Sequence, residues 1–274
     1  MSVATAVSAL SDGLVVAKRN LIKIKRVPDL LVFTTLQPIM FVVLFAYVFG
    51  GAINLGGAGD GGKAYREFLM GGIFAQTVIF GATITGAGLA DDIQKGIIDR
   101  FRSLPMSQGA VLIGRTLSDV TNNVLVVIVM ALTGLAVGWR IHTSVPEAIG
   151  GFLLLLGFAY AFSWVMAFVG LLAPSPEVVN NASFIVIFPL TFVANTFVPA
   201  NTLPGPLKTF AEWNPVSSVA QGARDLFGNH VPGAPVPDSW ALQHPVVYTL
   251  IWAVGILAVF VPLANYQYRR AASR

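Results

Sequence analysis

Six long runs of apolar residues, separated by short polar segments, dominate the pattern of this chain. The runs cover residues 30–49, 68–90, 120–139, 148–173, 178–198 and 245–264, and none contains a charged residue. A helix of about 20 apolar residues is long enough to cross a bilayer. The pattern therefore predicts an all-α integral membrane protein with six transmembrane helices, in which residues 1–274 form one transmembrane domain.

A different pattern occupies residues 7–27, ahead of the first apolar run. Leu10, Leu14, Ala17, Leu21 and Ile24 recur at helical spacing, and basic residues such as Arg19 and Lys23 fall on the opposite side. A basic amphipathic helix of this kind lies in a membrane surface. A calmodulin-binding segment would show the same pattern, but the adjacent apolar run favours an interfacial helix.

The longest charged passage, residues 91–119, joins the second and third runs. Between residues 91 and 104 an apolar stripe opposes a charged stripe of Asp92, Lys95, Asp99 and Arg102, and Pro105 follows. The apolar stripe consists of Ile93, Ile97, Phe101 and Leu104. This spacing predicts a short amphipathic helix over 91–104 that ends before the proline. The alternative is a solvated loop that carries topological charges.

Residues 203–229 are too polar and too interrupted to span a membrane. Leu207, Phe210 and Trp213 indicate a first short helix, and Asn214-Pro215 indicates the start of a second, with Asn214 as N-cap and Pro215 at its first position. Two short helices that leave and return on one side form a re-entrant hairpin. The nearby Asn195 lies at the end of the fifth run, where an interfacial position would accommodate its amide.

Composition supports a membrane location and excludes several kinds of chemistry. Hydrophobic residues make up 55% of the 274 residues and charged residues 11%, whereas soluble domains carry about 25% charged residues. The net charge of +4 is modest, and it reflects topology rather than nucleic-acid binding. The absence of cysteine excludes disulfides and thiolate metal sites.

Basic residues also predict an orientation. With both termini in the cytoplasm, five of the 17 lysines and arginines lie outside, and the remaining twelve lie inside. The outside residues are Lys63, Arg66, Arg140, Lys208 and Arg224. This distribution follows the positive-inside rule. It places residues 91–104 in the cytoplasm and the 203–229 hairpin outside.

Catalytic and nucleotide-binding patterns are missing from the chain. Gly57, Gly62 and Lys63 match the start of a phosphate-binding loop, but Ala64 stands where Ser or Thr would hold Mg²⁺. No acid, lysine or arginine falls within a predicted span, so carboxylate-based ion antiport has no carrier. His142, His230 and His244 are separated from one another. We therefore expect a non-catalytic subunit without cofactor or metal, which takes its energy from a partner.

Several motifs resemble the permeases of ABC-2 exporters, and the daunorubicin-resistance type in particular. They comprise Asp92, Gly96-Ile97, residues 99–107, Gly114-Arg115 and Asp119, together with residues 188–191, 195–199 and 213–217. The resemblance implies the ABC-2 fold, with 91–104 as a coupling helix that docks on an ATPase. Its coupling residues would be Asp92, Lys95, Ile97, Asp99, Arg100, Phe101 and Arg102. An outer gate would contain Asn195, Phe197, Trp213, Asn214 and Pro215.

The implied function is ATP-driven export of hydrophobic or amphipathic, drug-like compounds across the inner (cytoplasmic) membrane by alternating access. Two ATPase subunits would hold ATP and Mg²⁺, and a second copy or a homologous permease would complete the pathway among membrane lipids. Export of a lipid, glycolipid or polyketide is an open alternative, because an apolar, Phe-rich wall accepts all of these cargoes. A non-transporting sensor or channel belongs to a different class and is also open. An intramembrane enzyme would need a catalytic pair within a span, and the sequence has none.

Overall fold

A computed structural model describes residues 28–49, 61–98, 110–230 and 237–271 of the chain. Within these ranges all regular structure is helical. The predicted interfacial helix at 7–27 lies outside the described residues, as do Gly57 and the segment 99–109. The predicted coupling residues Asp99, Arg100, Phe101 and Arg102 therefore have no structural description.

Long helices account for most of the described chain. They are α2 (Pro28–Leu44), which continues as a π-helical turn η1 (Phe45–Phe49), α3 (Gly61–Gly81), α4 (Thr83–Gln94), α6 (Ala110–Ala136), α7 (Val145–Leu172), α8 (Pro176–Phe192) and α12 (Pro245–Ala271). Shorter elements are η2 (Ala200–Thr202), α9 (Gly205–Trp213), α10 (Pro215–Phe227) and α11 (Trp240–Gln243).

Four described helical segments are long and apolar enough to cross a membrane. They are Gly62–Gln94, Val111–Ala136, Val145–Leu172 and Pro245–Arg270. Two further apolar helices are shorter, Thr35–Val48 and Pro176–Phe192. The first segment runs through α3 and α4 with a single turn residue at Ala82. Its 33 residues extend for about 50 Å, well beyond the bilayer core of about 30 Å.

Several helix boundaries differ from the sequence prediction, and three of them affect the candidate sites. α6 starts at Ala110, ten residues before the predicted third span, and so takes in Arg115 and Asp119. α8 ends at Phe192, six residues before the predicted end of the fifth span. α4 ends at Gln94, and the backbone of Gly96 then turns through a left-handed conformation with φ of 64°. A continuous helix over 91–104 is therefore wrong at its start.

α7 is the central helix of the bundle and packs against α12, α4, α10 and α6. Its sequence is apolar on every side, as expected for a helix surrounded by other helices. Large side chains such as Leu155, Phe158 and Trp164 are buried along it. Facing glycines bring α7 close to α4, because a Cβ at Gly170 would lie 2.7 Å from the Cα of Gly86.

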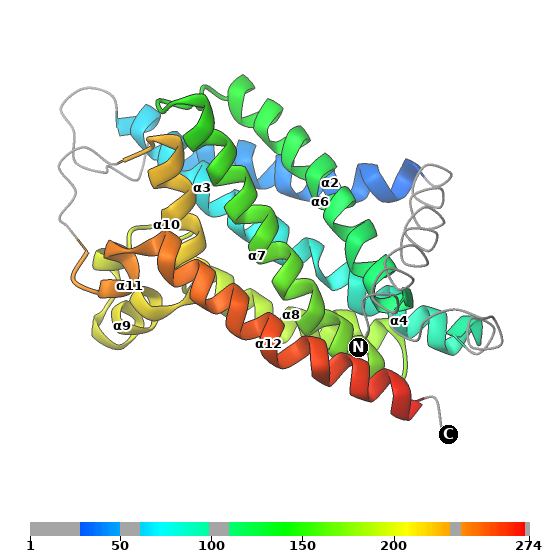
Figure 1. Cartoon of the computed structure of the whole chain (residues 1–274). Coiled ribbons are helices and arrows are strands. Elements are labelled where there is room, and N and C mark those ends of the chain that lie inside the picture. The colour runs from blue at the N-terminus through cyan, green and yellow to red at the C-terminus, as the bar shows by residue number, and fades with distance from the viewer. Residues whose placement is uncertain (1–27, 50–60, 99–109, 231–236, 272–274) are drawn as a thin grey trace.

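The two ends of the bundle differ in character. α9, α10 and α11 gather at one end, at the left of Figure 1, and the C-terminal ends of α4 and α12 lie at the opposite end. The short helices α9 and α10 therefore lie at the end of the bundle opposite to the one at which the charged segment 91–119 begins. This arrangement determines where the candidate sites lie.

Candidate transport pathway and its two ends

An aromatic cavity of about 310 Å³ lies among α2, α3, α4, α6 and α8. Phenylalanines from three of these helices line it: Phe41, Phe80, Phe184, Phe188 and Phe192. Along α8 their rings follow one another, with centroids 5.0 Å apart between Phe184 and Phe188 and 4.0 Å apart between Phe188 and Phe192. Phe184 is 53% exposed, so the cavity opens toward the side of the bundle.

Polar groups occupy a minority of the cavity wall. Gln37, Gln76, Thr77 and Asn122 contribute them, and all lie on helices that also carry apolar lining residues. An apolar pocket of about 300 Å³ or more with a few polar groups matches the general form of a small-molecule site. Among the described residues no group of three or more His, Cys, Asp or Glu could hold a metal ion. The mixed lining of the cavity, mostly apolar with a few amides and hydroxyls, is of the kind that accommodates small amphipathic molecules.

The segment after α8 brings Phe197 into contact with two residues of the cavity wall. Phe197 stacks on Phe45 at 4.4 Å between centroids and contacts Phe192 at 4.9 Å and Phe41 at 6.4 Å. Two of these three rings line the cavity. The predicted gate residue Phe197 thus lies against the cavity wall, which the sequence alone did not indicate.

Asn214 connects the hairpin to α8 as well as capping α10. Its Oδ1 accepts from the backbone N–H of Val216 at 2.9 Å, the N-cap that the sequence predicts. Its Nδ2 donates to the carbonyl of Leu190 at 2.7 Å. Because α8 ends at Phe192, this carbonyl is one of the last four in the helix and lacks the usual intrahelical partner.

The remaining gate residues take different environments. Pro215 is the first residue of α10. Trp213 is 49% exposed, and its carbonyl accepts from the hydroxyl of Tyr248 at 2.9 Å. Asn195 is buried within the protein, at 3% exposure, and its position at the membrane interface stays a prediction. The early end of α8 leaves Asn195 in a turn, where its N–H donates to Ser217 Oγ at 2.9 Å.

Arg224 on α10 was not predicted as a site residue and is almost fully buried, at 1% exposure. Its Nε donates to the carbonyl of Phe68 at 2.7 Å, and one terminal nitrogen donates to the carbonyls of Asn195 at 2.7 Å and Thr196 at 3.2 Å. Burial lowers the pKa of Arg224 to about 9. This value is still above neutral pH, so the side chain remains charged. The amphipathic sequence pattern of α10 gave no signal for this burial.

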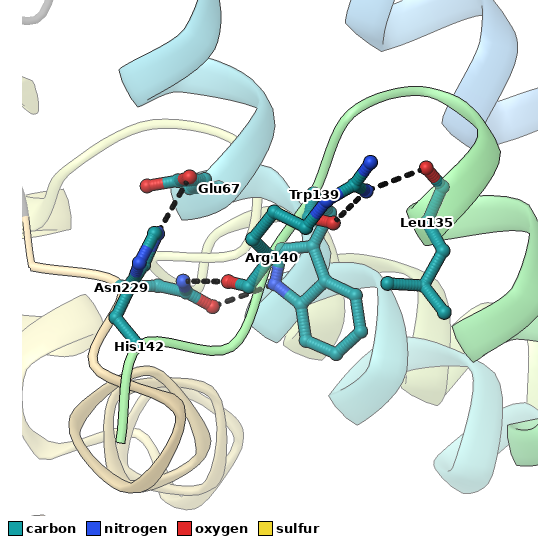
Figure 2. Close-up of polar contacts among 6 residues, drawn as sticks. All are labelled: Glu67, Leu135, Trp139, Arg140, His142 and Asn229. Carbon is teal, nitrogen blue, oxygen red and sulfur yellow. Dashed lines mark hydrogen bonds and ion pairs between the residues drawn. The ribbon is translucent and has the colours of Figure 1, made fainter.

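A hydrogen-bond network beside the hairpin joins three distant segments (Figure 2). Trp139 Nε1 donates to Asn229 Oδ1 at 2.6 Å, and Asn229 Nδ2 donates to the carbonyl of Arg140 at 2.8 Å. Beside them, His142 Nε2 lies 2.8 Å from Glu67 Oε1. The network holds the end of α10 against the α6–α7 connection and the start of α3.

At the opposite end of the bundle, the described coupling residues do not share one face. Asp92 is buried, at 5% exposure, whereas Lys95 has an exposed side chain that pairs with Asp91 at 2.8 Å. Ile97 follows the Gly96 turn and is half-buried. The helix breaks after Gln94, between Asp92 and Ile97, so one helical face does not extend through the described part of this segment.

Arg115 and Asp119 hold α6 against α4 close to this end. Thr85 Oγ1 donates to Asp119 Oδ2, and Arg115 Nη2 donates to the carbonyl of Ile84 at 3.0 Å. Asp119 is 5% exposed and lies inside a candidate span. The prediction that no acid or arginine falls within a span is therefore wrong. The early start of α6 is the reason.

Comparisons with known proteins agree with this arrangement. The family model described as ABC-2 type transporter matches residues 13–227. The chain is 35% identical over 266 residues to a daunorubicin resistance ABC transporter permease of Streptomyces coeruleorubidus, covering 97% of this chain and 88% of that protein.

More distant relatives are also described as permeases. A probable doxorubicin resistance ABC transporter permease of Mycobacterium tuberculosis is 27% identical over 244 residues, covering 86% of this chain and 80% of that protein. A putative transport permease of Pyropia yezoensis is 26% identical over 215 residues, covering 77% and 72%. The family match over most of the chain and the long apolar helices together show that this chain is a multi-pass membrane protein of the ABC-2 type transporter permease family.

Proposed function

We propose that this chain is the permease subunit of an ATP-driven exporter that moves hydrophobic or amphipathic, drug-like compounds out of the cytoplasm. The observation that carries the proposal is 35% identity over 97% of the chain to a daunorubicin resistance permease. The aromatic cavity among α2, α3, α6 and α8 supports it, because its size and mixed lining suit a flat, amphipathic molecule.

The energy for transport comes from a partner in this proposal. Two ATPase subunits bind ATP and Mg²⁺, and a second copy of this chain or a homologous permease completes the pathway. The segment 91–104 carries the movement of the ATPases to α4, and Asp99, Arg100, Phe101 and Arg102 are the proposed contacts. The position of α4 supports this role, because α4 lines the cavity and follows α3 after a single turn residue, so a displacement of α4 would move part of the cavity wall.

Alternating access requires that the cavity open to each side in turn. The outer gate in this proposal is the segment around Asn195 and Phe197 together with the α9–α10 hairpin, with both chain termini in the cytoplasm. The contacts of the Phe197 ring with Phe41 and Phe192 of the cavity wall support this assignment, since a displacement of Phe197 would alter that part of the wall.

The exposed position of Phe184 on the cavity wall also favours lipid export as a second candidate, since cargo would enter from the bilayer.

The test is co-expression of this chain with its ATPase, followed by preparation of inside-out vesicles. ATP-dependent accumulation of doxorubicin, lost when the phosphate-binding lysine of the ATPase is replaced, is the expected result. Transfer of a fluorescent phospholipid without doxorubicin accumulation would select the lipid exporter. ATP-independent fluxes would identify a channel and overturn the proposal.

A further inference from the structure

Arg224 is a buried cation that forms no ion pair with any described carboxylate. Its hydrogen bonds go to three backbone carbonyls, those of Phe68, Asn195 and Thr196, and its guanidinium carbon lies 3.6 Å from the centroid of the Phe68 ring. The adjacent Asp225 accepts from Gln221 Nε2 at 2.9 Å and lies 3.5 Å from His230. Apart from this neighbouring carboxylate, which is engaged by Gln221 and His230, the positive charge of Arg224 is met by carbonyl dipoles and a ring face.

The hydrogen-bonding capacity of this site is incompletely used. The second terminal nitrogen of Arg224, Nη1, is buried and has no partner, and the same holds for Asn195 Oδ1 and Thr196 Oγ1. Burying an arginine that forms no ion pair is destabilising, and a buried donor without an acceptor adds to that cost. A bound group with acceptor oxygens and negative charge would satisfy both requirements.

A cavity of about 410 Å³ connects the site to the surface. Its lining includes the buried Arg224 and Asn195, the amides of Gln221 and Asn229, and the exposed residues His230 and Asp238. The other lining cation, Lys208, already pairs with Asp238 at 2.6 Å and with Glu212 at 3.7 Å. Lys208 thus bridges both carboxylates of the cavity, whereas Arg224 pairs with neither of them in the described residues and keeps a donor without a partner.

We propose that this cavity binds an oxyanion, a phosphate or carboxylate group, on the free Nη1 edge of Arg224. A planar guanidinium recognises such groups through charge-assisted hydrogen bonds, and the neighbouring amides supply additional donors. Either a free anion or the headgroup of an anionic lipid provides this chemistry. The site is separate from the aromatic cavity and does not depend on the proposed cargo.

The first experiment measures thermal unfolding of the purified full-length chain in a neutral detergent, with phosphate titrated against sodium chloride at equal ionic strength. A ligand at about 100 times its Kd is expected to raise Tm by about 5 °C. Asn195→Asp supplies an internal carboxylate beside Arg224 and should fold but lose this response. Lys208→Gln removes the paired cation of the same cavity and should keep it.

The second experiment separates a lipid from a free anion. The same variants are placed in phosphatidylcholine nanodiscs with and without phosphatidylglycerol, and retained lipids are counted by native mass spectrometry. Retention of phosphatidylglycerol by wild type and Lys208→Gln, but not by Asn195→Asp, identifies a lipid headgroup. A response to phosphate alone identifies a free anion.

Three results would overturn the proposal. One is the absence of both responses in the wild-type chain. Another is an equal response in Asn195→Asp, which would make the effect nonspecific. The third is loss of the response in Lys208→Gln with its retention in Asn195→Asp, which would move the site to Lys208. In each case Arg224 serves only to hold the segment after α8 against α3.

Discussion

Asn214 shows how one side chain can fix the geometry of two elements. Its oxygen caps α10 through Val216, and its nitrogen satisfies the Leu190 carbonyl near the end of α8. This carbonyl lies in the last turn of α8, so no intrahelical N–H can replace a lost hydrogen bond. Both interactions therefore contribute to the position of the hairpin relative to the aromatic cavity.

Asn214→Ala is expected to destabilise the chain by about 2 kcal/mol, because it removes an N-cap worth about 1 kcal/mol and a hydrogen bond worth a similar amount. Asn214→Ser keeps a cap acceptor but does not reach Leu190, so about half of the loss should remain. Thermal unfolding of the purified chain measures both effects. The exposed Asn201 provides the control Asn201→Ala, and equal stabilities for the two alanine variants would contradict the assignment.

The N-cap role of Asn214 could be predicted from the sequence, but the burial of Arg224 could not. An Asn-Pro pair at the start of a helix predicts a local interaction, because the Asn side chain accepts a hydrogen bond from a backbone N–H two residues later. The partners of Arg224 lie 156, 29 and 28 residues away in sequence. Its burial depends on α8 ending early and on the contact between α10 and α3, and neither is encoded near Arg224 itself.

At the scale of helices, the contact between α4 and α7 depends on two glycines that face each other. A Cβ at Gly86 would lie 2.5 Å from the carbonyl oxygen of Met166, and a Cβ at Gly170 would lie 2.7 Å from the Cα of Gly86. Backbone atoms cannot rotate aside as side chains can. Small residues of this kind allow close helix packing in membranes.

Gly170→Ala is therefore expected to push α4 and α7 apart and to lower stability by about 1–3 kcal/mol. Gly157 lies on the same helix, and a Cβ there would meet no atom within 4 Å. Gly157→Ala should be neutral or stabilising by up to about 1 kcal/mol, because alanine favours the helix. Thermal unfolding of the two variants side by side measures the difference. Equal effects would mean that the close approach of α4 and α7 is unimportant for stability.

Helix boundaries were the least predictable features of the elements. The approximate positions of the long apolar helices followed from hydropathy, but α6 begins at Ala110 although its first turns contain Arg115 and Asp119. These residues are accommodated by α4, through Ile84 and Thr85, and a hydropathy pattern contains no information on such partners. Gly96 breaks the predicted amphipathic helix because its backbone adopts a conformation that glycine favours.

The whole molecule places its two candidate ends on opposite sides of the bundle. The hairpin helices α9 and α10 lie at one end, and α4 and the end of α12 lie at the other (Figure 1). In the proposed orientation the hairpin faces outward and the end of α4 faces the cytoplasm. This orientation is the one that the distribution of lysines and arginines along the sequence predicts.

Single cysteines test this orientation directly, because the natural chain contains none. Lys95→Cys and Asn201→Cys introduce thiols at two exposed positions near the two ends. In intact cells a membrane-impermeant maleimide should label Asn201→Cys only, and after permeabilisation it should label both. Labelling of Lys95→Cys from outside would contradict the proposed topology.

The central claim is that the aromatic cavity holds the cargo of an ATP-driven exporter. The most direct measurement is the dependence of ATP-driven doxorubicin accumulation on doxorubicin concentration, in vesicles that contain the complex of this chain with its ATPase. Phe188→Ala removes a ring from the cavity wall and is expected to raise the half-saturating concentration about tenfold, since a lost apolar contact is worth about 1–3 kcal/mol. Leu153→Ala, at an exposed position of α7 outside the cavity, should leave it unchanged. The same concentration dependence in both variants, at equal amounts of complex, would contradict the assignment of this cavity to the cargo.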